Sequence, residues 1–592
     1  MVGLPYDCLA NPLGAVRLTF EKAVSSGLNP STSTAADWGA VDLFRQFLFD
    51  DGGLSQVPIL NAASVKYLLA NSLVRFRGMI QDMLGNEVYV GAYKDGSTWR
   101  TNKFSDVCQF EMDMSPDMKF WERRLLYCVP VPGLNSWAEP VEALSNQQRN
   151  FATQQREKRP RDDDDETVDH MELGSNQDCE DSPITKKMRE EGHPSSSSMQ
   201  QDTVKEGTTP SFGPPDSEIN SFPCLVKVYD SPESDLKLNE IFEFIGVLNY
   251  DPELSLNKDE SDMQSNDLYE DDLVQLPPSK VPRIHCLVHQ KLVALDFVDG
   301  SPMTESNPSM IRGIREGLLS HLTAVLGNDG VAAQFLLLHL LSQVHARVDG
   351  VAVGKFSLNF TNFSKETASV FSKRLGLTMK ELLPFTKQMP LAIEYLNSAS
   401  LAPKKDYQAN KLVPGALQLA EGSHLIIDET LLQAGTLNPT GVENARSLKN
   451  LTELQQVEYD FQYYKMEMKA DVQLLVLSEG KSNILPADLV LPFQPSSTSS
   501  SEIVDEAILQ TWRWYLAFLR SLSHLISPEM QKVVEEDLVA ARQADRTLGS
   551  QDFSRLLTMS RLMSLSFGET SLSMEHWQMV KELERLRKER VR

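Results

Sequence analysis

The sequence predicts a multi-domain α/β protein, in which a small β-barrel split by a disordered insertion precedes an α/β domain with a helical lid. Three observations predict this class. The chain has 592 residues, enough for three or four domains. Short alternating strand patterns stand on both sides of a long polar stretch that is poor in aromatic residues. A buried-strand pattern flanked by helices then leads into four amphipathic helices near the C-terminus.

Composition and charge narrow the class of function. Lys and Arg total 57 against 82 Asp and Glu, giving a formal net charge of −25. That balance argues against a general nucleic-acid binder, which needs basic surface to displace counterions. The six cysteines form no CxxC pair, which is typical of free thiols in a reducing compartment. No apolar run approaches a membrane span and no signal-like pattern opens the chain, so we expect a soluble intracellular protein without a membrane partner.

The hydrophobic pattern of the first 250 residues predicts a helical segment followed by the barrel. Helical patterning around Ala15–Ser26 and Trp38–Leu48 fills residues 1–60. The barrel strands are expected over Ser72–Ile80, Glu87–Tyr93, Leu125–Val131, Cys224–Val228 and Ile241–Leu248. A turn at Gly85-Asn86 would separate the first two strands, and Gly78 would form a bulge or a bend. Short strands with glycine bends favour a Greek-key barrel of the OB type, built from residues 61–136 and 219–250.

The segment between the two parts of the barrel, residues 137–218, is rich in Gln, Asp, Glu, Ser and Pro. It lacks the apolar content needed to fold and is therefore predicted to be a disordered insertion. Residues 251–280 form a second, acidic linker. Two basic clusters in the insertion resemble nuclear-import signals, although a solvated run of charge is the alternative. The cluster residues are Lys158, Arg159, Arg161, Lys186, Lys187 and Arg189.

The central element of the α/β domain is a predicted helix over Gly415–Glu421, followed by a buried strand over His424–Ile427 that ends in Asp428 and Glu429. Two adjacent carboxylates at the end of a buried strand are the Walker B layout of ATPases. There the first acid holds Mg²⁺ through water and the second polarises the attacking water. The alternative is that these acids only cap the next helix. The wider pattern, Leu-Ala-Glu-Gly and then Leu-Ile-Ile-Asp-Glu, resembles the same segment of the replicative MCM helicases, which are AAA+ ATPases.

The remaining elements complete the α/β domain and its lid. Strong apolar patterns predict helices over Val331–His345 and Ser364–Leu375, the second capped by Asn362 or Ser364. Alternating patterns predict strands over Val351–Phe360, Val457–Met468 and Asp471–Leu477. After a polar linker, Pro495–Ser501, the lid helices are expected over Glu502–Leu525, Ser527–Ala544, Gln551–Phe567 and Ser573–Arg590.

The resemblance to the MCM ATPase module can be followed through residues 322–592, but the phosphate-binding loop is missing. A strand that should be followed by GxxxxGK[ST] instead runs into Thr361–Ser364, without a glycine and without a Lys-Ser/Thr pair. Gly354–Ser357 is a tempting fragment, but it lies within the predicted strand.

At other nucleotide-binding positions, this sequence also departs from the pattern of the helicases. The sensor-one asparagine of the family is replaced by a Ser478-Glu479-Gly480 sequence. In the frame Leu485–Phe493, the position of the arginine finger is Pro492. The sensor-two arginine falls on Ser554 or Arg555, depending on a one-residue choice of alignment. An arginine finger contributes a large part of transition-state stabilisation, and proline cannot replace it.

This combination is similar to the family of MCM complex-binding proteins, which are MCM-like proteins without ATPase motifs. Arg283–Leu287, Gly330–Leu341 and Gly354–Asn359 carry the resemblance most clearly. It implies a degenerate AAA+ core over 281–495, a helical lid over 502–592, and a role for Asp428 and Glu429 that is structural.

The functional implication is a non-enzymatic adaptor without a cofactor that binds MCM helicase subunits in the nucleus. The resemblance further implies indirect contact with chromatin, no sequence-specific nucleic-acid binding, and roles in helicase unloading and sister-chromatid cohesion. Two rivals remain: an active ATPase whose phosphate loop is Gly350–Lys355, and a single-strand DNA binder that uses the barrel. A metal site at His285-Cys286-x-x-His289 lacks a fourth ligand, so core packing is the favoured interpretation.

Overall fold

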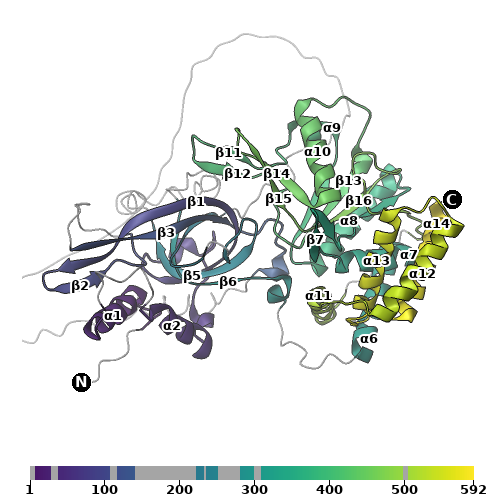
Figure 1. Cartoon of the computed structure of the whole chain (residues 1–592). Coiled ribbons are helices and arrows are strands. Elements are labelled where there is room, and N and C mark those ends of the chain that lie inside the picture. The colour runs from purple at the N-terminus through teal and green to yellow at the C-terminus, as the bar shows by residue number, and fades with distance from the viewer. Residues whose placement is uncertain are drawn as a thin grey trace, which may run out of the picture. The chain divides into compact units, whose positions relative to one another are not determined.

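The computed structural model describes residues 7–28, 38–106, 117–139, 222–232, 235–250, 281–298, 308–497 and 504–591. These residues form a mixed α/β protein with several sheets (Figure 1). Most of the predicted insertion and the whole acidic linker lie outside the described residues. The same holds for the import-cluster residues Lys158, Arg159, Arg161, Lys186, Lys187 and Arg189. Among the helices that are described, none is long and apolar enough to cross a bilayer.

The N-terminal part contains a six-stranded sheet with the order β2-β1-β3-β4-β6-β5. Its strands are β1 (Leu73–Asp95), β2 (Thr98–Thr101), β3 (Met118–Val129), β4 (Cys224–Val228), β5 (Ile241–Asn249) and β6 (Arg283–Lys291). Because β5 also pairs with β1, five of these strands form a closed ring. All pairings are antiparallel except that of β4 with β6. Inward-facing apolar side chains such as Phe76, Val226 and Phe244 fill the ring.

The predicted turn at Gly85-Asn86 is wrong, because β1 is one continuous strand of 23 residues. Gly85 has φ +92° and lies at a register shift against β3, so a bulge accommodates the glycine while the ladder continues on both sides. The strand pairs first with β5 and then with β3, which bends the sheet into a barrel. The last barrel strand, β6, lies in the range that the sequence analysis assigned to the α/β core.

Two N-terminal helices cover one side of the barrel, as Figure 1 shows. Helix α1 (Pro12–Ser25) and helix α2 (Ala40–Arg45), which continues as a π-turn over Gln46–Asp50, confirm the predicted helical segment. Phe20 and Phe44 are buried in one core with barrel residues that include Trp121. The short 3-10 helices η2 (Gly53–Gln56) and η3 (Val65–Tyr67) lead into β1.

The α/β domain is built on a parallel five-stranded sheet with the order β10-β13-β16-β9-β17. Its strands are β9 (Leu358–Thr361), β10 (Thr386–Pro390), β13 (Ser423–Asp428), β16 (Val472–Leu477) and β17 (Leu489–Pro492). One face packs on α6 (Pro308–Val325), α7 (Gly330–Leu341), α8 (Lys365–Leu382) and the lid, and the other on α9 (Ile393–Ser398) and α10 (Pro439–Leu454). Alternate strand residues serve the two cores: Ile426 faces the first, and Leu425 and Ile427 face the second.

Two smaller sheets flank this one. The first has the order β12-β11-β14-β15, from β11 (Lys404–Asp406), β12 (Lys411–Val413), β14 (Gln456–Asp460) and β15 (Lys465–Lys469). The second is a hairpin of β7 (Ala346–Val348) and β8 (Val351–Val353). The range Val457–Met468, predicted as strand, is therefore the hairpin β14–β15. The range Val351–Phe360 splits into β8 and β9, with Gly354 between them at φ +96°.

The predicted helix over Gly415–Glu421 is wrong, because this segment is not helical in the structure. Its backbone instead binds a neighbouring segment: Ala416 N donates to Ser400 O, and Leu417 N donates to Leu401 O. A Cβ at Gly415 would lie 2.2 Å from the Leu401 carbonyl oxygen, so the glycine permits a close approach of two backbones. Tertiary hydrogen bonds thus override the helical spacing that the sequence shows.

All four helices predicted for the C-terminal segment are confirmed: α11 (Glu506–Ser521), α12 (Pro528–Ala544), α13 (Ser550–Ser566) and α14 (Met574–Val591). We use the word lid only as a label for these four helices. Helix α14 is fastened to the sheet domain at its C-terminal end. Arg590 Nη1 and Nη2 donate to the two carboxylate oxygens of Asp329, at 2.7 and 2.8 Å. Asp329 is fully buried and also caps α7 through Ala332 N, and it accepts a further bond from Gln494 N. We call Asp329 and Arg590 the lid latch.

Polar side chains join the barrel to the α/β domain. Asp82 in β1 accepts hydrogen bonds from Lys405 Nζ at 2.9 Å and from Leu412 N at 2.7 Å. A second contact joins the buried side chains of Tyr459 and Asn239, which lie within 3.0 Å of each other. Each bond satisfies a group that would otherwise be buried without a partner. The barrel and the α/β domain belong to the same compact unit.

Candidate functional site

The two carboxylates that the sequence singles out lie at the carboxyl end of β13. Asp428 Oδ1 accepts hydrogen bonds from the backbone N and the side-chain Oγ1 of Thr430, and so caps the 3-10 helix η7 (Glu429–Leu431). Glu429 Oε1 accepts from Ser482 Oγ at 2.9 Å. Burial raises the pKa of Glu429, which favours its protonated form. Both acids are thus bonded to neighbouring groups of the protein itself.

The loop after β9, where a phosphate-binding loop would stand, has its backbone donors occupied. Asn362 N donates to Glu479 O at 3.0 Å and Phe363 N donates to Ser478 O at 3.3 Å. The Asn362 side chain donates to Phe493 O, and its backbone holds φ +72°. Phosphate loops work by leaving successive N–H groups free to face the anion. Here the N–H groups of Asn362 and Phe363 are used inside the protein.

Phenylalanine side chains fill the space beside this loop. Phe363 stacks on Phe493 with ring centroids 4.8 Å apart, and Phe371 meets Phe493 edge-on at the same distance. All three are buried, and they belong to the main core of the domain. An aromatic cluster of this kind stabilises the fold, and it leaves no polar cradle for a triphosphate.

The lysine of the Gly354–Ser357 fragment is held by an acid. Lys355 Nζ pairs with Asp488 Oδ1 at 2.5 Å, and Asp488 Oδ2 accepts from both the backbone N and the Oγ of Ser357. Lys355 and Ser357 precede β9, whereas Asp428 is the last residue of β13. Because β9, β16 and β13 run parallel, Lys355 and Asp428 lie at opposite ends of the sheet. The structure does not bring together the two groups that an alternative ATP site would need.

The other helicase positions are also engaged internally. Ser478 Oγ lies 2.8 Å from Asn359 Oδ1 and 2.6 Å from the Gly480 carbonyl. The carbonyl of Pro492 accepts a bond from Arg590. Arg555 forms ion pairs with Asp552 and Glu584. The side chains that could have sensed a nucleotide are bound to their neighbours.

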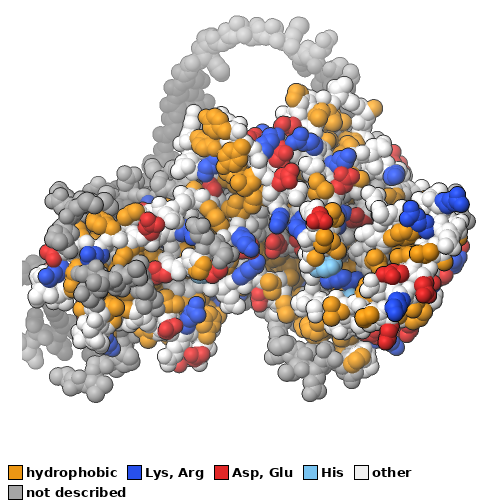
Figure 2. All heavy atoms as spheres, in the orientation of Figure 1, with side chains coloured by type: hydrophobic (Ala, Val, Ile, Leu, Met, Phe, Trp, Pro, Cys, Tyr) orange, Lys and Arg blue, Asp and Glu red, His pale blue; other side chains and the backbone are white. Residues whose placement is uncertain are grey.

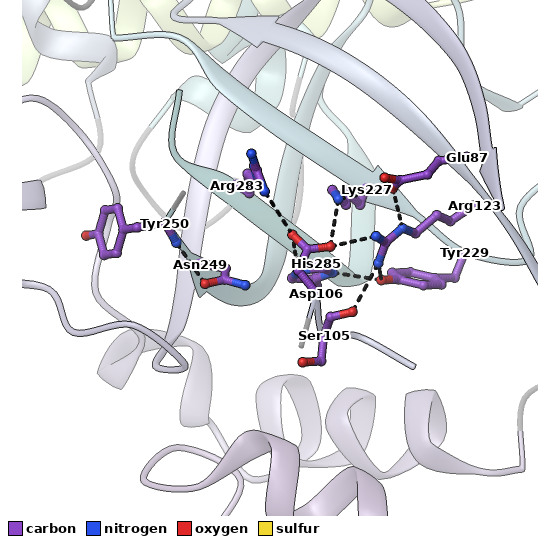
Figure 3. A network of polar contacts seen from close by, with 10 residues as sticks. All are labelled: Glu87, Ser105, Asp106, Arg123, Lys227, Tyr229, Asn249, Tyr250, Arg283 and His285. Atoms are coloured by element: carbon purple, nitrogen blue, oxygen red, sulfur yellow. Dashed lines mark hydrogen bonds and ion pairs between the residues drawn. The ribbon is translucent and has the colours of Figure 1, made fainter. Parts of the chain in front are cut away.

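The barrel also carries a charged network that was not predicted from the sequence. Asp106 Oδ1 accepts from Arg123 Nη2 at 2.6 Å and from Lys227 Nζ at 2.7 Å (Figure 3). Glu87 Oε2 accepts from the same two side chains, at 2.7 and 3.1 Å. Burial by itself would raise the pKa of Asp106, but His285 and the neighbouring cations outweigh it and lower that pKa. Arg123 and Lys227 are thus each paired with acids of the same network.

The network includes His285 from the proposed metal fragment. Tyr229 OH accepts from Arg123 Nη1 at 3.0 Å and lies 2.7 Å from His285 Nδ1. The Nε2 atom of His285 lies 3.3 Å from Asp106. Cys286 faces the opposite side of β6, in the barrel core. Within the described ranges, no three His, Cys, Asp or Glu side chains are grouped to hold a metal ion.

Comparison with known proteins gives the family. The family model described as mini-chromosome maintenance replisome factor matches residues 44–591. The mini-chromosome maintenance complex-binding protein of Arabidopsis thaliana is 57% identical over 595 residues, covering 100% of both chains. The proteins of the same name from Homo sapiens and Salmo salar are 35% and 34% identical, each covering 99% of this chain and 98% of its own length. The chain therefore belongs to the family of mini-chromosome maintenance replisome factors, whose curated members bear the name mini-chromosome maintenance complex-binding protein.

Proposed function

We propose that this protein is a non-catalytic adaptor that binds subunits of the MCM helicase complex and thereby regulates DNA replication. Family membership across residues 44–591 carries the choice of partner, because its relatives are named for binding that complex. The closed loop after β9 is the observation that supports a non-catalytic role. Its backbone donors at Asn362 and Phe363 are already bonded, and Phe493 covers the loop.

The proposed mode of binding is subunit mimicry. We assign the parallel sheet and lid to a degenerate AAA+ domain, and the closed five-strand ring to an OB-like barrel. The parallel order of β10, β13, β16, β9 and β17, with helices on both faces, supports the first assignment. The closure of β5 on β1 supports the second. A body shaped like a helicase subunit offers side surfaces of the kind that neighbouring subunits bury when they assemble.

The two rival functions fit the geometry less well. An ATPase built on Gly350–Lys355 would place its lysine at the amino end of the sheet, far from Asp428, and Asp488 already pairs with that lysine. A single-strand DNA binder would need free cations on the barrel, but two of the barrel's buried cations, Arg123 and Lys227, are paired with acids, and the chain carries a net charge of −25.

The cellular role follows from the resemblance, and we propose that the adaptor promotes MCM unloading from chromatin, supports sister-chromatid cohesion and acts in the nucleus. Changing the import-cluster residues to alanine tests the last point. A tagged protein with Lys158, Arg159, Arg161, Lys186 and Lys187 replaced should remain in the cytoplasm. An unchanged nuclear signal would mean that import depends on a partner or on another segment.

Binding and catalysis are tested together with the full-length purified protein. Co-purification with recombinant MCM subunits, followed by mass analysis of the bound species, should recover a stoichiometric complex. Isothermal titration with Mg-ATP should show no binding in the micromolar range. Micromolar ATP affinity that Lys355→Ala and Asp428→Asn abolish would refute the adaptor proposal, and so would failure to bind any MCM subunit.

A further inference from the structure

The lid contains a buried arginine that has no counterion. Arg561 lies on α13 and is 8% exposed, and its Nη1 atom is buried without a hydrogen-bond partner. Among the residues that the structure describes, no acid forms an ion pair with Arg561, and burial by itself lowers the pKa of its guanidinium. Desolvating a charge is costly, so buried cations are normally paired. Arg561 is therefore a cation whose counterion the described residues do not supply.

Other buried arginines of the lid differ from Arg561 in this respect. Arg513 on α11 forms an ion pair with Glu506. Arg520, near the end of the same helix, has the carboxylate of Asp471 close by, which opposes the effect of burial on the pKa of Arg520. Each of these two cations is thus balanced by an acid of the chain. The absence of such an acid at Arg561 calls for a separate explanation.

Two histidines lie beside Arg561. Burial and then the nearby charge of Arg561 lower the pKa of both His345, which directly precedes β7, and His524, which follows α11. His524 Nε2 is buried without a hydrogen-bond partner, whereas His345 is exposed. Figure 2 shows a histidine side chain at the surface, with basic side chains next to it, between the elements that Figure 1 labels β7 and α11. We call Arg561, His345 and His524 the lid cluster.

The surroundings of the lid cluster are basic. The charged or titratable groups that act on His524 are Arg561, His345 and His576. An acid does approach His576, because Glu569 Oε2 lies 3.4 Å from His576 Nδ1. No carboxylate of the described residues affects the pKa of Arg561, so Glu569 does not neutralise that guanidinium. This basic surrounding lies in a chain whose net charge is −25.

The lid cluster lies at the amino end of the parallel sheet. Val344 N, in the residue before His345, donates to Asp471 Oδ1 at 3.0 Å, and Asp471 directly precedes β16. Asp428, at the Walker B position, is instead the last residue of β13, which runs parallel to β16. The lid cluster is therefore separate from the end of the sheet at which the helicases bind nucleotide.

We propose that the lid cluster binds an oxyanion, either a phosphate or a carboxylate group, with the Arg561 guanidinium as its main ligand. A guanidinium presents paired N–H donors that match two oxygens of such a group. His524 offers a further ring nitrogen, and the exposed His345 lies where the anion enters. This inference goes beyond the proposed function and does not depend on it. The oxyanion can belong to a small molecule or to an acidic or phosphorylated side chain of a partner protein.

The test is hydrogen exchange of the full-length protein, followed by mass spectrometry, without and with about 50 mM inorganic phosphate. The ionic strength is kept equal with sodium chloride, so that screening is the same in both samples. Phosphate should slow the exchange of amides in α13 and in residues 522–526, because a ligand stabilises the state that binds it. For a Kd of about 5 mM, the protection of those amides should rise about tenfold.

Variants of α13 make the test specific. Arg561→Gln should abolish the protection by phosphate, and Arg561→Lys should keep part of it, because lysine retains the charge without the paired donors. The matched control is Arg555→Gln, since Arg555 lies on the same helix and already pairs with Asp552 and Glu584. That variant should respond to phosphate like the wild type. In phosphate-free buffer, Arg561→Gln should leave the urea midpoint unchanged or raise it, because it removes an unpaired buried charge.

Three results would overturn the inference. They are a wild type that phosphate does not protect, a protection that Arg561→Gln retains, and a lower urea midpoint of Arg561→Gln in phosphate-free buffer. The source of the oxyanion is then found by biolayer interferometry with purified MCM subunits. Weaker binding of Arg561→Gln, with free phosphate also weakening binding of the wild type, assigns the oxyanion to the partner, and unchanged binding assigns it to a small molecule. A wild type that binds no MCM subunit refutes the adaptor proposal and leaves the result with phosphate standing.

Discussion

Replacing Arg590 by alanine would open the lid latch. The substitution removes two charge-assisted hydrogen bonds, of 2.7 and 2.8 Å, from a carboxylate that is fully buried. Removing one partner of a buried ion pair costs about 3–5 kcal/mol. Asp329 would keep the backbone donors Ala332 N and Gln494 N, each at 3.0 Å, which lowers the penalty. We therefore expect a loss of about 2–3 kcal/mol in the free energy of unfolding.

The assay is urea denaturation of the full-length protein followed by far-ultraviolet circular dichroism, with the m-value checked for constancy. Arg585→Ala is the matched control, because Arg585 lies on the same helix and pairs only with exposed acids. Its midpoint should not move measurably. Amides of α14 should also exchange faster with solvent in the Arg590 variant. Equal midpoints for the two variants would refute the reasoning, because they would show that the buried carboxylate does not need Arg590.

Three further predictions follow from buried groups. Trp577→Ala should lower the free energy of unfolding by about 3–5 kcal/mol in the same assay, because the indole is buried in the lid. Burial lowers the pKa of His339 to about 4 and that of His424 well below its usual value, so unfolding takes up protons below about pH 6.5. The free energy of unfolding should be at its full value above that pH and should fall as the pH drops towards 4. The variant His424→Gln, whose amide can still donate to His339, should lose less of its free energy of unfolding over the same pH range. Asp82→Ala should cost about 2–4 kcal/mol, since Lys405 loses its buried counterion; a denaturation midpoint equal to that of the wild type would contradict this.

Sequence patterns predicted the elements whose stability is local. The lid helices follow from apolar spacing with capping residues, such as Ser527 at the start of α12. The Gly415–Glu421 segment has a similar spacing, but its backbone bonds to Ser400 and Leu401, each sixteen residues before its partner in the chain. No local pattern reports such a partner.

The candidate site likewise has features that a local sequence pattern shows and features that depend on residues far apart in the chain. The missing glycines and lysine after β9 were visible in the sequence, because a phosphate loop is a contiguous motif. The pairing of Lys355 with Asp488 was not, since 133 residues separate the two. The network of Asp106 with Arg123, Lys227 and His285 draws on three strands and a loop. Its local signal was a charged residue within an otherwise apolar strand, Lys227 in Cys224–Val228.

The pairing of β3 with β4 identifies a place between these two strands where the polypeptide could be cut into two complementary fragments. Cys128 and Cys224 are register partners, so the chain leaves and re-enters the barrel at adjacent points of the same sheet. A break anywhere between Glu139 and Phe222 would leave two pieces whose strands still complete each other, through β3 with β4 and β1 with β5. The two halves, produced as separate polypeptides, are thus complementary fragments of one barrel. We therefore expect the fold to tolerate lengthening or cutting of the covalent link between them, because the hydrogen-bonded pairs of strands hold the two fragments together.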